Sequence, residues 1–490
     1  MPNPALFIDG YKLDHRRQYP EGTEFVYSNW TARSSRIEDQ KHVVFLGLQH
    51  FLQKYLIDDF QRNFFERNID EVCEEYERRV NGYLGPNTVG TDHIRALHAL
   101  GYIPLEFSAL PEGSLVPLRV PMFVVENTHP DFGWVTNYFE TVLSCEIWLP
   151  CTSATLAYRM RDLLDRAAVA TGSPRDFVQW QGHDFSMRGM SGVEAASLSG
   201  LGHLLSFTGT DTIPAIELAE VFYGRGLDEG YLIGGSIPAT EHSVMCAGGA
   251  GNEAETVGHI LDLYQAGPVS IVADTWNFWE FVGEIIPKYK DAIMARDGKV
   301  VIRPDSGDPV LIICGDPAEP VGSPAHKGAI QILWETFGGT ITETGHKLLD
   351  SHIGCIYGDS ITYERADAIL TNLYRKGFAS GNMVFGVGSY TYQYVTRDTF
   401  GFAMKATNVV INDESLAIFK DPITDGGSKK SAKGRLAVLL TEHGHYTLVN
   451  EATPEQEEMS ELKPVWRDGK FITTWNIAEM RENLHGTSQN

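Results

Sequence analysis

The segment His183–Gly189 (HDFSMRG) brings a histidine, a carboxylate, an aromatic ring and an arginine close together in the sequence. An arginine next to glycine suits a phosphate or diphosphate, because its guanidinium forms bidentate, charge-assisted hydrogen bonds. The ring of Phe185 could stack on a flat ligand. The alternative is that Arg188 only forms a salt bridge and that Phe185 only packs in the core. The segment is therefore a candidate site for a planar ring beside a phosphate.

Two later segments place single functional groups among small residues. In FTGTDT (Phe207–Thr212), the carboxylate of Asp211 could accept hydrogen bonds from an amide ligand, or it could cap the N-terminus of a helix. In SIPATEHSV (Ser236–Val244), Glu241 precedes His242. A neutral imidazole can act as a general base or as a phosphoryl acceptor, and a neighbouring carboxylate could orient it, although a lone histidine is more often structural.

Arginine and aspartate come close together in VIRPDSGDP (Val301–Pro309). Arg303 and Asp305 are two residues apart at the end of a predicted strand, so their side chains share a face. This arrangement pairs a cation for a phosphate with a carboxylate for a sugar hydroxyl or for Mg²⁺.

The chain as a whole is acidic, with 40 Lys and Arg residues against 64 Asp and Glu residues and a formal net charge of −24. This excess argues against nucleic acid or an anionic membrane as a partner. It also makes a local group of cations informative. Lys420–Arg435 contains five cations and two carboxylates among Gly and Ser, and the segment Thr396–Lys405 precedes it. We interpret this region as a polyphosphate-binding loop, with a solvated surface loop as the alternative.

The remaining composition is that of a folded protein without export signals or cross-links. Hydrophobic residues make up 43% of the chain, and its six cysteines form no CxxC pair, so we expect neither disulfides nor a metal site held by the protein. The start, MPNPALFIDGYK, has no basic region and no long apolar run, so it is not a signal peptide. No run approaches the roughly 18 apolar residues of a membrane span. We expect a cytoplasmic protein.

Short strands must position the candidate groups. Ile353–Asp359, Ile361–Gly377 and Asn382–Gly388 are predicted as strand, helix and strand, because the apolar runs end in Asp or Gly and the helix has a basic last turn. Pro268–Asp274 and Lys299–Gly307 have the same character and are predicted as two more strands. The middle of the chain is therefore expected to form a parallel sheet from βαβ units.

The four predicted strands end in an acidic residue or in glycine, at Asp274, Asp305, Asp359 and Gly388. In parallel α/β folds, the carboxyl ends of the strands converge on one face, and ligands bind there. Carboxylates accept hydrogen bonds from ribose hydroxyls, and glycines let backbone N–H groups reach phosphates. The alternative is that Asp and Gly only mark turns. The pattern favours a polyhydroxylated ligand at this face.

Both ends of the chain differ in pattern from its middle. Helical spacing over Leu48–Leu56 and over Leu156–Ala167, with a stop at Gly172, predicts two helices. A further helix is predicted at Asn476–Leu484. We predict an α/β fold with a barrel-like catalytic domain at residues 151–390 and a flanking, mostly antiparallel α+β domain built from residues 1–150 and 391–490. The segments expected to form the flanking strands are 110–128 and the two hairpins 434–449 and 465–475.

Taken together, these segments resemble the nicotinamide phosphoribosyltransferase family, and in particular its bacterial or phage branch. The resemblance is ordered along nearly the whole chain, and the motifs are specific in combination. They are DGYKLDHRRQYP, YSNWTAR, HDFSMRG, FTGTDT, PATEHS, IRPDSG, YGDS, TRD and FKDP followed by GRL. The resemblance implies a type II phosphoribosyltransferase, which combines an irregular α/β barrel with an antiparallel domain and works as a homodimer with shared active sites.

The resemblance also implies roles for individual residues. Phe185 would stack on the nicotinamide ring, with Tyr11 of the partner subunit on the opposite face. Asp211 would accept hydrogen bonds from the carboxamide. The residues implied to hold phosphoribosyl pyrophosphate and its phosphates are Arg188, Arg303, Asp305, Gly358, Asp359, Gly388, Ser389 and Arg397.

ATP is the implied co-substrate, and Mg²⁺ is the implied cofactor, held mainly through the substrate phosphates. His242 would be phosphorylated by ATP, with Glu241 and Asp274 as supporting carboxylates, and these residues would form the catalytic set together with Asp305. The cations implied to bind nucleotide phosphates are Arg33, from the other subunit, and Lys405 and Lys420.

The implied reaction transfers the phosphoribosyl group of phosphoribosyl pyrophosphate to nicotinamide, with coupled ATP hydrolysis. The neutral pyridine nitrogen needs no general base, so catalysis would be mainly positioning and electrostatics. Nicotinate phosphoribosyltransferase is an alternative, against which Asp211 argues because it would repel a carboxylate. A barrel lyase or metal-dependent hydrolase is a second alternative, disfavoured by the missing histidine pairs, and a non-catalytic binding protein is a third.

Overall fold

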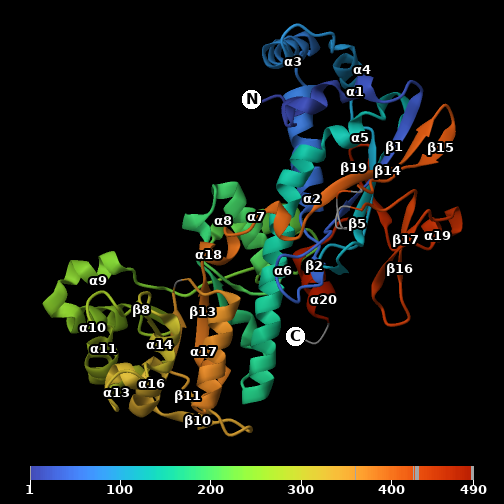
Figure 1. Cartoon of the computed structure of the whole chain (residues 1–490). Helices are drawn as coiled ribbons and strands as arrows, with labels where there is room; N and C mark the ends of the chain where they lie inside the picture. The colour runs from blue at the N-terminus through green and yellow to red at the C-terminus, as the bar shows by residue number, and fades with distance from the viewer. Residues whose placement is uncertain (1, 359, 423, 425–429, 487–490) are drawn as a thin grey trace.

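Two large sheets organise the computed structural model of this chain, which describes residues 2–358, 360–422, 424 and 430–486 (Figure 1). The first sheet is antiparallel, with the strand order β15-β14-β1-β5-β3-β18-β19. Its strands are β1 (Thr23–Thr31), β3 (Leu105–Ala109), β5 (Pro121–Asn127), β14 (Ala403–Ile411), β15 (Glu414–Ala417), β18 (Lys463–Arg467) and β19 (Lys470–Phe471).

The second sheet is parallel, with the strand order β7-β6-β13-β12-β9-β8. Its strands are β6 (Gly182–Asp184), β7 (Gly209–Thr210), β8 (Val269–Val272), β9 (Val300–Arg303), β12 (Ile353–Tyr357) and β13 (Met383–Val387). Because all six strands run in the same direction, their carboxyl ends lie along one edge. Each strand is short and buried, as expected for a parallel sheet that helices cover.

The parallel sheet curls until a short segment joins its two edge strands. Gly235 forms a parallel bridge with Gly209 of β7, and Ala239 forms one with Ser270 of β8. The carbonyl of Gly235 accepts from Thr210 N at 3.0 Å, and the Thr240 hydroxyl accepts from Val272 N at 2.9 Å. This segment therefore completes an irregular α/β barrel and also carries residues of the SIPATEHS motif across its mouth.

Helices surround the sheets, and α6 (Glu140–Thr171) runs between the two parts of the molecule (Figure 1). It ends at Gly172, which has a φ of 63° and so takes the left-handed conformation common at helix ends. Other main helices are α3 (Ile69–Leu84), α4 (Asp92–Leu100), α7 (Val193–Leu204), α8 (Ile213–Tyr223), α9 (His242–Gly248), α10 (Glu253–Leu263), α14 (Pro309–Cys314), α16 (Ala329–Phe337), α17 (Tyr363–Arg375), α18 (Ser389–Tyr392) and α20 (Ile477–His485). Among the described residues, none of the helices combines the length and the apolar character that a membrane span requires.

Each sheet has its own apolar core. In the antiparallel part, the buried ring of Trp30 is stacked between Phe123 and Phe402, with centroid distances of 6.2 and 5.6 Å. In the parallel part, side chains of β8, β9, β12 and β13 pack against α10, α16 and α17. Burial of these two separate apolar surfaces supplies most of the driving force for folding.

Several local predictions from the sequence are confirmed. The βαβ unit forms as β12, α17 and β13, with β12 and β13 paired in parallel. The first tail hairpin forms as β16 (Leu436–Leu440) and β17 (Tyr446–Asn450), and the second as β18 and β19, turning at Asp468 and Gly469, both with positive φ. The predicted helix at Leu48–Leu56 forms as α2 (Leu48–Phe51), which continues with π-helical turns over Leu52–Asp59. The division into domains at residues 150 and 390 stays a prediction.

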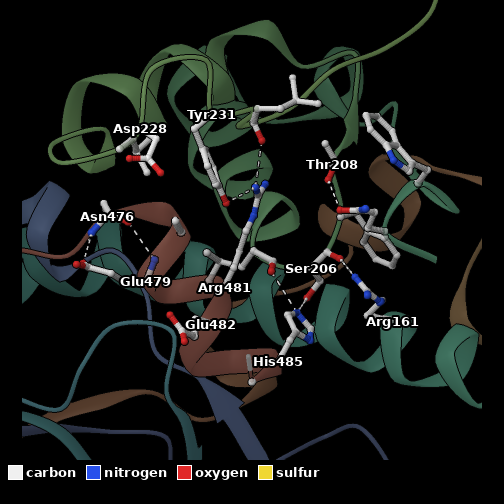
Figure 2. A pocket seen from close by; sticks show the side chains of 18 of the residues that line it. Arg161, Ser206, Thr208, Asp228, Tyr231, Asn476, Glu479, Arg481, Glu482 and His485 are labelled. Atoms are coloured by element: carbon white, nitrogen blue, oxygen red, sulfur yellow. Dashed lines mark hydrogen bonds between the residues drawn. The ribbon is translucent and has the colours of Figure 1, made fainter. Parts of the chain in front are cut away.

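Side chains of the C-terminal helix α20 and of α6 contact backbone carbonyls at and just after the end of α7. Figure 2 shows the Arg481 guanidinium next to the Tyr231 hydroxyl, and His485 and Arg161 next to Ser206. Arg481 Nε donates to Leu204 O at 2.8 Å, and Arg161 donates to Ser206 O at 2.7 Å. His485 Nε2 lies 3.2 Å from Leu205 O. Cations suit the carbonyl end of a helix, so these contacts stabilise the packing of the tail on the barrel.

Candidate active site

Most of the residues singled out from the sequence lie at the carboxyl edge of the parallel sheet. Phe185 follows β6, Asp211 follows β7, Asp274 follows β8, and Asp305 follows β9. Gly358 follows β12, and Gly388 and Ser389 follow β13. The expectation that strand ends gather these groups is confirmed, because all of these strands pair in parallel.

The ring of Phe185 lies against the backbone of a neighbouring strand. A Cβ atom on Gly386 of β13 would lie 2.8 Å from Phe185 Cδ2, so only glycine leaves room for the ring there. The rings of His183 and Phe185 have centroids 4.6 Å apart, and the Arg303 guanidinium carbon lies 6.0 Å from the Phe185 ring. Phe185 is only partly buried, so it is available to a planar ligand.

Asp211 does not cap a helix, which overturns that alternative. Thr212 occupies the N-cap position of α8, while Asp211 Oδ1 accepts from Ser236 Oγ at 2.7 Å and lies 2.8 Å from His183 Nε2. Burial alone would raise the pKa of Asp211, but the hydrogen bonds from His183 and Ser236 outweigh it, and the pKa is lowered. Asp211 is therefore a fixed anion beside the ring of Phe185.

His183 and Ser236 are functional candidates that the sequence analysis missed. His183 and Phe185 are two residues apart on an extended chain, so their side chains share a face, and this spacing could have identified the histidine. Ser236 carries no comparable local signal, because the barrel-closing segment brings it to Asp211 from 25 residues away.

Arg303, Asp305 and Gly358 form one compact group, as the sequence predicted for the first two. A Cβ atom on Gly358 would lie 2.5 Å from Asp305 Oδ1 and 3.3 Å from Arg303 Cδ. Arg303 donates to Thr240 O at 2.7 Å, while its buried Nε has no hydrogen-bond partner among the described residues. A buried donor of this kind indicates a place for an anionic ligand.

His242 lies beside two carboxylates at the start of α9. Its Nε2 is 3.7 Å from Asp305 Oδ2 and 3.9 Å from Asp274 Oδ1, and its Nδ1 is 3.2 Å from Thr275 Oγ1. Asp274 Oδ2 accepts from Asp305 N at 2.9 Å, while the buried Oδ1 has no hydrogen-bond partner in the described part of the chain. The acceptor atoms of Asp274 thus hold the Asp305 loop and face the imidazole.

The expected support of His242 by Glu241 is corrected by this geometry. Glu241 occupies the N-cap position of α9, and its exposed carboxylate accepts a hydrogen bond from the Ser243 hydroxyl instead. At the N-cap, the chain changes from an extended to a helical conformation, which directs neighbouring side chains apart. The carboxylates that face His242 are therefore Asp274 and Asp305.

The HDFSMRG loop meets the loop after β13. A side chain on Gly189 would collide with Ser389 Oγ at the start of α18, so these two loops are in direct contact. Arg188 is exposed and forms no hydrogen bond or ion pair with the described residues. Its guanidinium is accessible to a phosphate above Gly388 and Ser389. The predicted site residue Asp359 lies outside the described residues.

A second group of predicted residues lies on the antiparallel sheet, well away from α9 and β8 (Figure 1). Burial lowers the pKa of Lys405, and the charges of Arg33, Lys420 and Lys12 lower it further, although the Glu140 carboxylate raises it. Burial and the charges of Glu140 and Asp9 raise the pKa of Tyr11, and the nearby charge of Arg397 opposes that shift only in part. The ring of Tyr11 is 60% exposed. One chain therefore does not bring these cations to the Phe185 site.

The comparisons with known proteins agree with this geometry. Residues 180–470 match the model of the nicotinate phosphoribosyltransferase (NAPRTase) family, and residues 3–79 match the nicotinamide phosphoribosyltransferase N-terminal domain. The nicotinamide phosphoribosyltransferase of Acinetobacter baylyi is 51% identical over 98% of this chain and 97% of its own. This chain belongs to the nicotinamide phosphoribosyltransferase family. A second such relative, from Mycoplasma genitalium, is 35% identical over 88% of this chain and 94% of its own.

Solved structures support the type II phosphoribosyltransferase fold of this family member. The nicotinate-nucleotide pyrophosphorylase of Pyrococcus furiosus superposes with a TM-score of 0.58 at 15% identity, covering 99% of this chain and 96% of the other. Human nicotinic acid phosphoribosyltransferase superposes with a TM-score of 0.52 at 16% identity, covering 98% of this chain and 93% of the other. The chain is thus a nicotinamide phosphoribosyltransferase family enzyme of NAD biosynthesis, with the barrel and the antiparallel sheet that its sequence predicted.

Proposed function

We propose that this enzyme transfers the phosphoribosyl group of phosphoribosyl pyrophosphate to nicotinamide, giving nicotinamide mononucleotide and pyrophosphate, and that ATP hydrolysis is coupled to the transfer through a phosphohistidine. The observation that carries the choice of substrate is the Asp211 carboxylate, held by His183 and Ser236 beside the ring of Phe185. It can accept from the –NH₂ of a carboxamide, whereas it would repel the carboxylate of nicotinate.

In the transfer step, the ring nitrogen of nicotinamide forms a bond to C1 of the ribose as the C1–oxygen bond to pyrophosphate breaks. The electron pair of that bond leaves with pyrophosphate, so no proton has to move. Arg303, whose buried Nε has no hydrogen-bond partner among the described residues, and the exposed Arg188 would bind the leaving diphosphate. Asp305 would accept from the ribose hydroxyls. Stacking on Phe185 would hold the base in line with C1.

Mg²⁺ would neutralise charge on the diphosphate. The substrate phosphates would supply most of its ligands, because Mg²⁺ is usually held by phosphates together with one or two carboxylates. Asp305, at the edge of the group formed with Arg303 and Gly358, is the carboxylate best placed to contact the ion or its waters. The chain's own residues would bind and orient the diphosphate on which the ion depends.

In the coupled reaction, His242 would take the terminal phosphoryl group of ATP, with release of ADP, and water would later cleave the N–P bond. Thr275 Oγ1 at Nδ1 orients the imidazole, and Asp274 and Asp305 lie on the side of Nε2. Phosphorylation would thus add negative charge next to the diphosphate site, where Asp305 could help to hold a Mg²⁺ ion that neutralises part of this charge. This gives a route by which ATP improves binding of phosphoribosyl pyrophosphate.

We further propose that two copies of the chain form a homodimer in which each active site is shared. Two observations support it. Arg33 and Lys405 belong to the antiparallel sheet, whereas Phe185 follows a strand of the parallel sheet. The mouth of the barrel also exposes an apolar rim. The exposed rim residues are Val193, Ile213, Val244, Trp276, Leu311, Tyr390 and Tyr394. The other subunit would cover this rim and place Tyr11 and the cations over the base and phosphates.

The substrate test is direct. Nicotinamide, phosphoribosyl pyrophosphate and Mg²⁺ are mixed with the enzyme, with and without ATP, and nicotinamide mononucleotide is measured beside the same assay on nicotinate. We expect product from nicotinamide and a higher rate with ATP. Absence of product under both conditions, or a preference for nicotinate, would reject the proposal. For the ATP step, His242→Ala should lose acid-labile phosphorylation and ATP stimulation while keeping the ATP-independent transfer.

Subunit mixing tests the shared site. Arg303→Ala and Arg33→Ala alter different groups of residues, so a heterodimer of the two variants has one site with both changes and one intact site. Half of randomly formed dimers are heterodimers, so co-folded variants should recover about a quarter of wild-type activity. A mixture of Arg303→Ala with Asp211→Ala, which alters the same group twice, is the matched control and should recover nothing. Equal activity in both mixtures would refute the shared site.

A further inference from the structure

A pocket of about 200 Å³ lies at one end of the central strands of the antiparallel sheet. Because β5 and β14 both run antiparallel to β1, the end of β1 meets the starts of both neighbours. Arg33 follows the end of β1, Arg119 lies two residues before the start of β5, and Lys405 is near the start of β14. Three adjacent strands therefore deliver three cations to one pocket, although the cations are far apart in the sequence.

Arg119 occupies a backbone position that normally favours glycine. Val120 N donates to Pro117 O at 3.2 Å, which closes a four-residue turn, and Arg119 is its third residue with a φ of 71°. Turns of this type take Gly or Asn at that place, and a longer side chain there costs about 1 kcal/mol. The Arg119 N–H donates to Ala32 O at 2.7 Å, which fixes the turn beside Arg33.

Such strain at an arginine indicates that its side chain is used, because a glycine would make the same turn at lower cost. The guanidinium of Arg119 is exposed and lines the pocket. Among the described residues, the pocket lining contains four cations, the fourth being Lys430, and no Asp or Glu.

Carboxylates lie near the two lysines of the pocket. Lys430 lies 3.3 Å from Asp421, and Lys405 lies 3.8 Å from Glu140. Glu140 also accepts from the buried Lys12 at 2.8 Å, so one carboxylate serves two lysines. In a chain with a net charge of −24, four cations at one pocket are unusual. Burial is the main cause of the lowered pKa of Lys405, and the charges of Arg33, Lys420 and Lys12 lower it further. The pocket suits a compact, multiply charged anion.

We propose that Arg119 is a phosphate-binding residue, which acts with Arg33 and Lys405 on the polyphosphate end of a ligand at this pocket. The proposal rests on the proposed function in one respect, that the ligand is ATP or phosphoribosyl pyrophosphate; the binding of a polyphosphate itself does not depend on it. The strained turn holds the guanidinium in place before the ligand arrives, which lowers the entropy cost of binding.

The test uses the full-length protein and calorimetric titration with inorganic tripolyphosphate. Arg119→Gly and Arg119→Asn both fit the turn, so each should keep or raise the melting temperature while binding tripolyphosphate about tenfold more weakly, as expected for the loss of one charged contact. Arg119→Lys keeps the charge and should fall between them and the wild type. Arg79→Ala, which removes an exposed cation from α3, is the matched control and should bind like the wild type.

Unchanged tripolyphosphate binding in Arg119→Gly and Arg119→Asn would overturn the proposal. Parallel KM measurements for ATP and for phosphoribosyl pyrophosphate identify the ligand, since the KM that rises is that of the ligand whose phosphates reach Arg119. Failure of the proposed function can be told apart from failure of this proposal. If the wild type makes no nicotinamide mononucleotide, the proposed function is wrong, but wild type and variants can still be compared for tripolyphosphate binding.

Discussion

Replacing Gly358 by alanine should disable the site with little effect on stability. The added Cβ would lie 2.5 Å from Asp305 Oδ1, whereas ordinary contacts begin at 3.4 Å, so the carboxylate must move by about 0.9 Å. Gly358 does not have a positive φ, and the alanine therefore adds no backbone strain. A misplacement of about 1 Å in a catalytic constellation costs roughly a hundredfold in rate, so kcat/KM for phosphoribosyl pyrophosphate should fall by about that factor.

The free energy of unfolding should change by less than about 1 kcal/mol, because only the end of a side chain that is 33% exposed has to move. Gly386→Ala is the contrasting variant. Its Cβ would lie 2.7 Å from the Tyr357 carbonyl oxygen and 2.8 Å from the Phe185 ring, and the backbone cannot retreat. We expect that variant to lose about 1–3 kcal/mol of stability as well as activity. Gly283→Ala, which meets no atom within 4 Å, is the neutral control.

Steady-state kinetics with varied phosphoribosyl pyrophosphate, together with urea unfolding, decides between the outcomes. The result that refutes the reasoning is a Gly358→Ala enzyme with wild-type kcat/KM, since the Asp305 carboxylate would then not need its present position. A loss of activity that only follows a loss of stability, as large as in Gly386→Ala, would also refute it.

Three other variants test different parts of the structure. Asp211→Asn should lower kcat/KM for nicotinamide by about tenfold, because a charged acceptor is lost, and should raise kcat/KM for nicotinate. If a competition assay gives the same ratio of the two kcat/KM values as the wild type, the specificity argument is wrong. Burial raises the pKa of Glu112 from 4.5 to about 7. The folded protein therefore holds this proton more tightly than the unfolded chain, and the free energy of unfolding should fall by up to about 3 kcal/mol as pH rises from about 4.5 to 7. Glu112→Gln should flatten that slope when unfolding is measured as a function of pH. Arg481→Met leaves the carbonyls of Leu204 and Ile233 without their donor, so the free energy of unfolding measured in urea should fall by at least about 2 kcal/mol. An unchanged midpoint would show that these hydrogen bonds do not stabilise the packing of α20.

Local features of the fold were predictable because they depend on neighbours in the sequence. The turn at Asp468 and Gly469 and the helix that stops at Gly172 follow from backbone preferences of single residues. The parallel βαβ unit follows from its apolar runs and turn residues, and it also placed the strand ends on one face. These preferences act over a few residues, so they survive without knowledge of the tertiary structure.

The sequence by itself determined which functional groups this protein has available: Phe185, Asp211, Arg303, Asp305 and His242 stood out as candidates, and the motifs in combination indicated the family. Only the tertiary structure decided which groups act on one another. It gave Asp211 its partners His183 and Ser236, and it showed that Asp305, not Glu241, lies beside His242. It also gathered Arg119 with Arg33 and Lys405. The physical reason is that strand pairing and barrel closure join segments over long sequence separations, which local preferences do not encode.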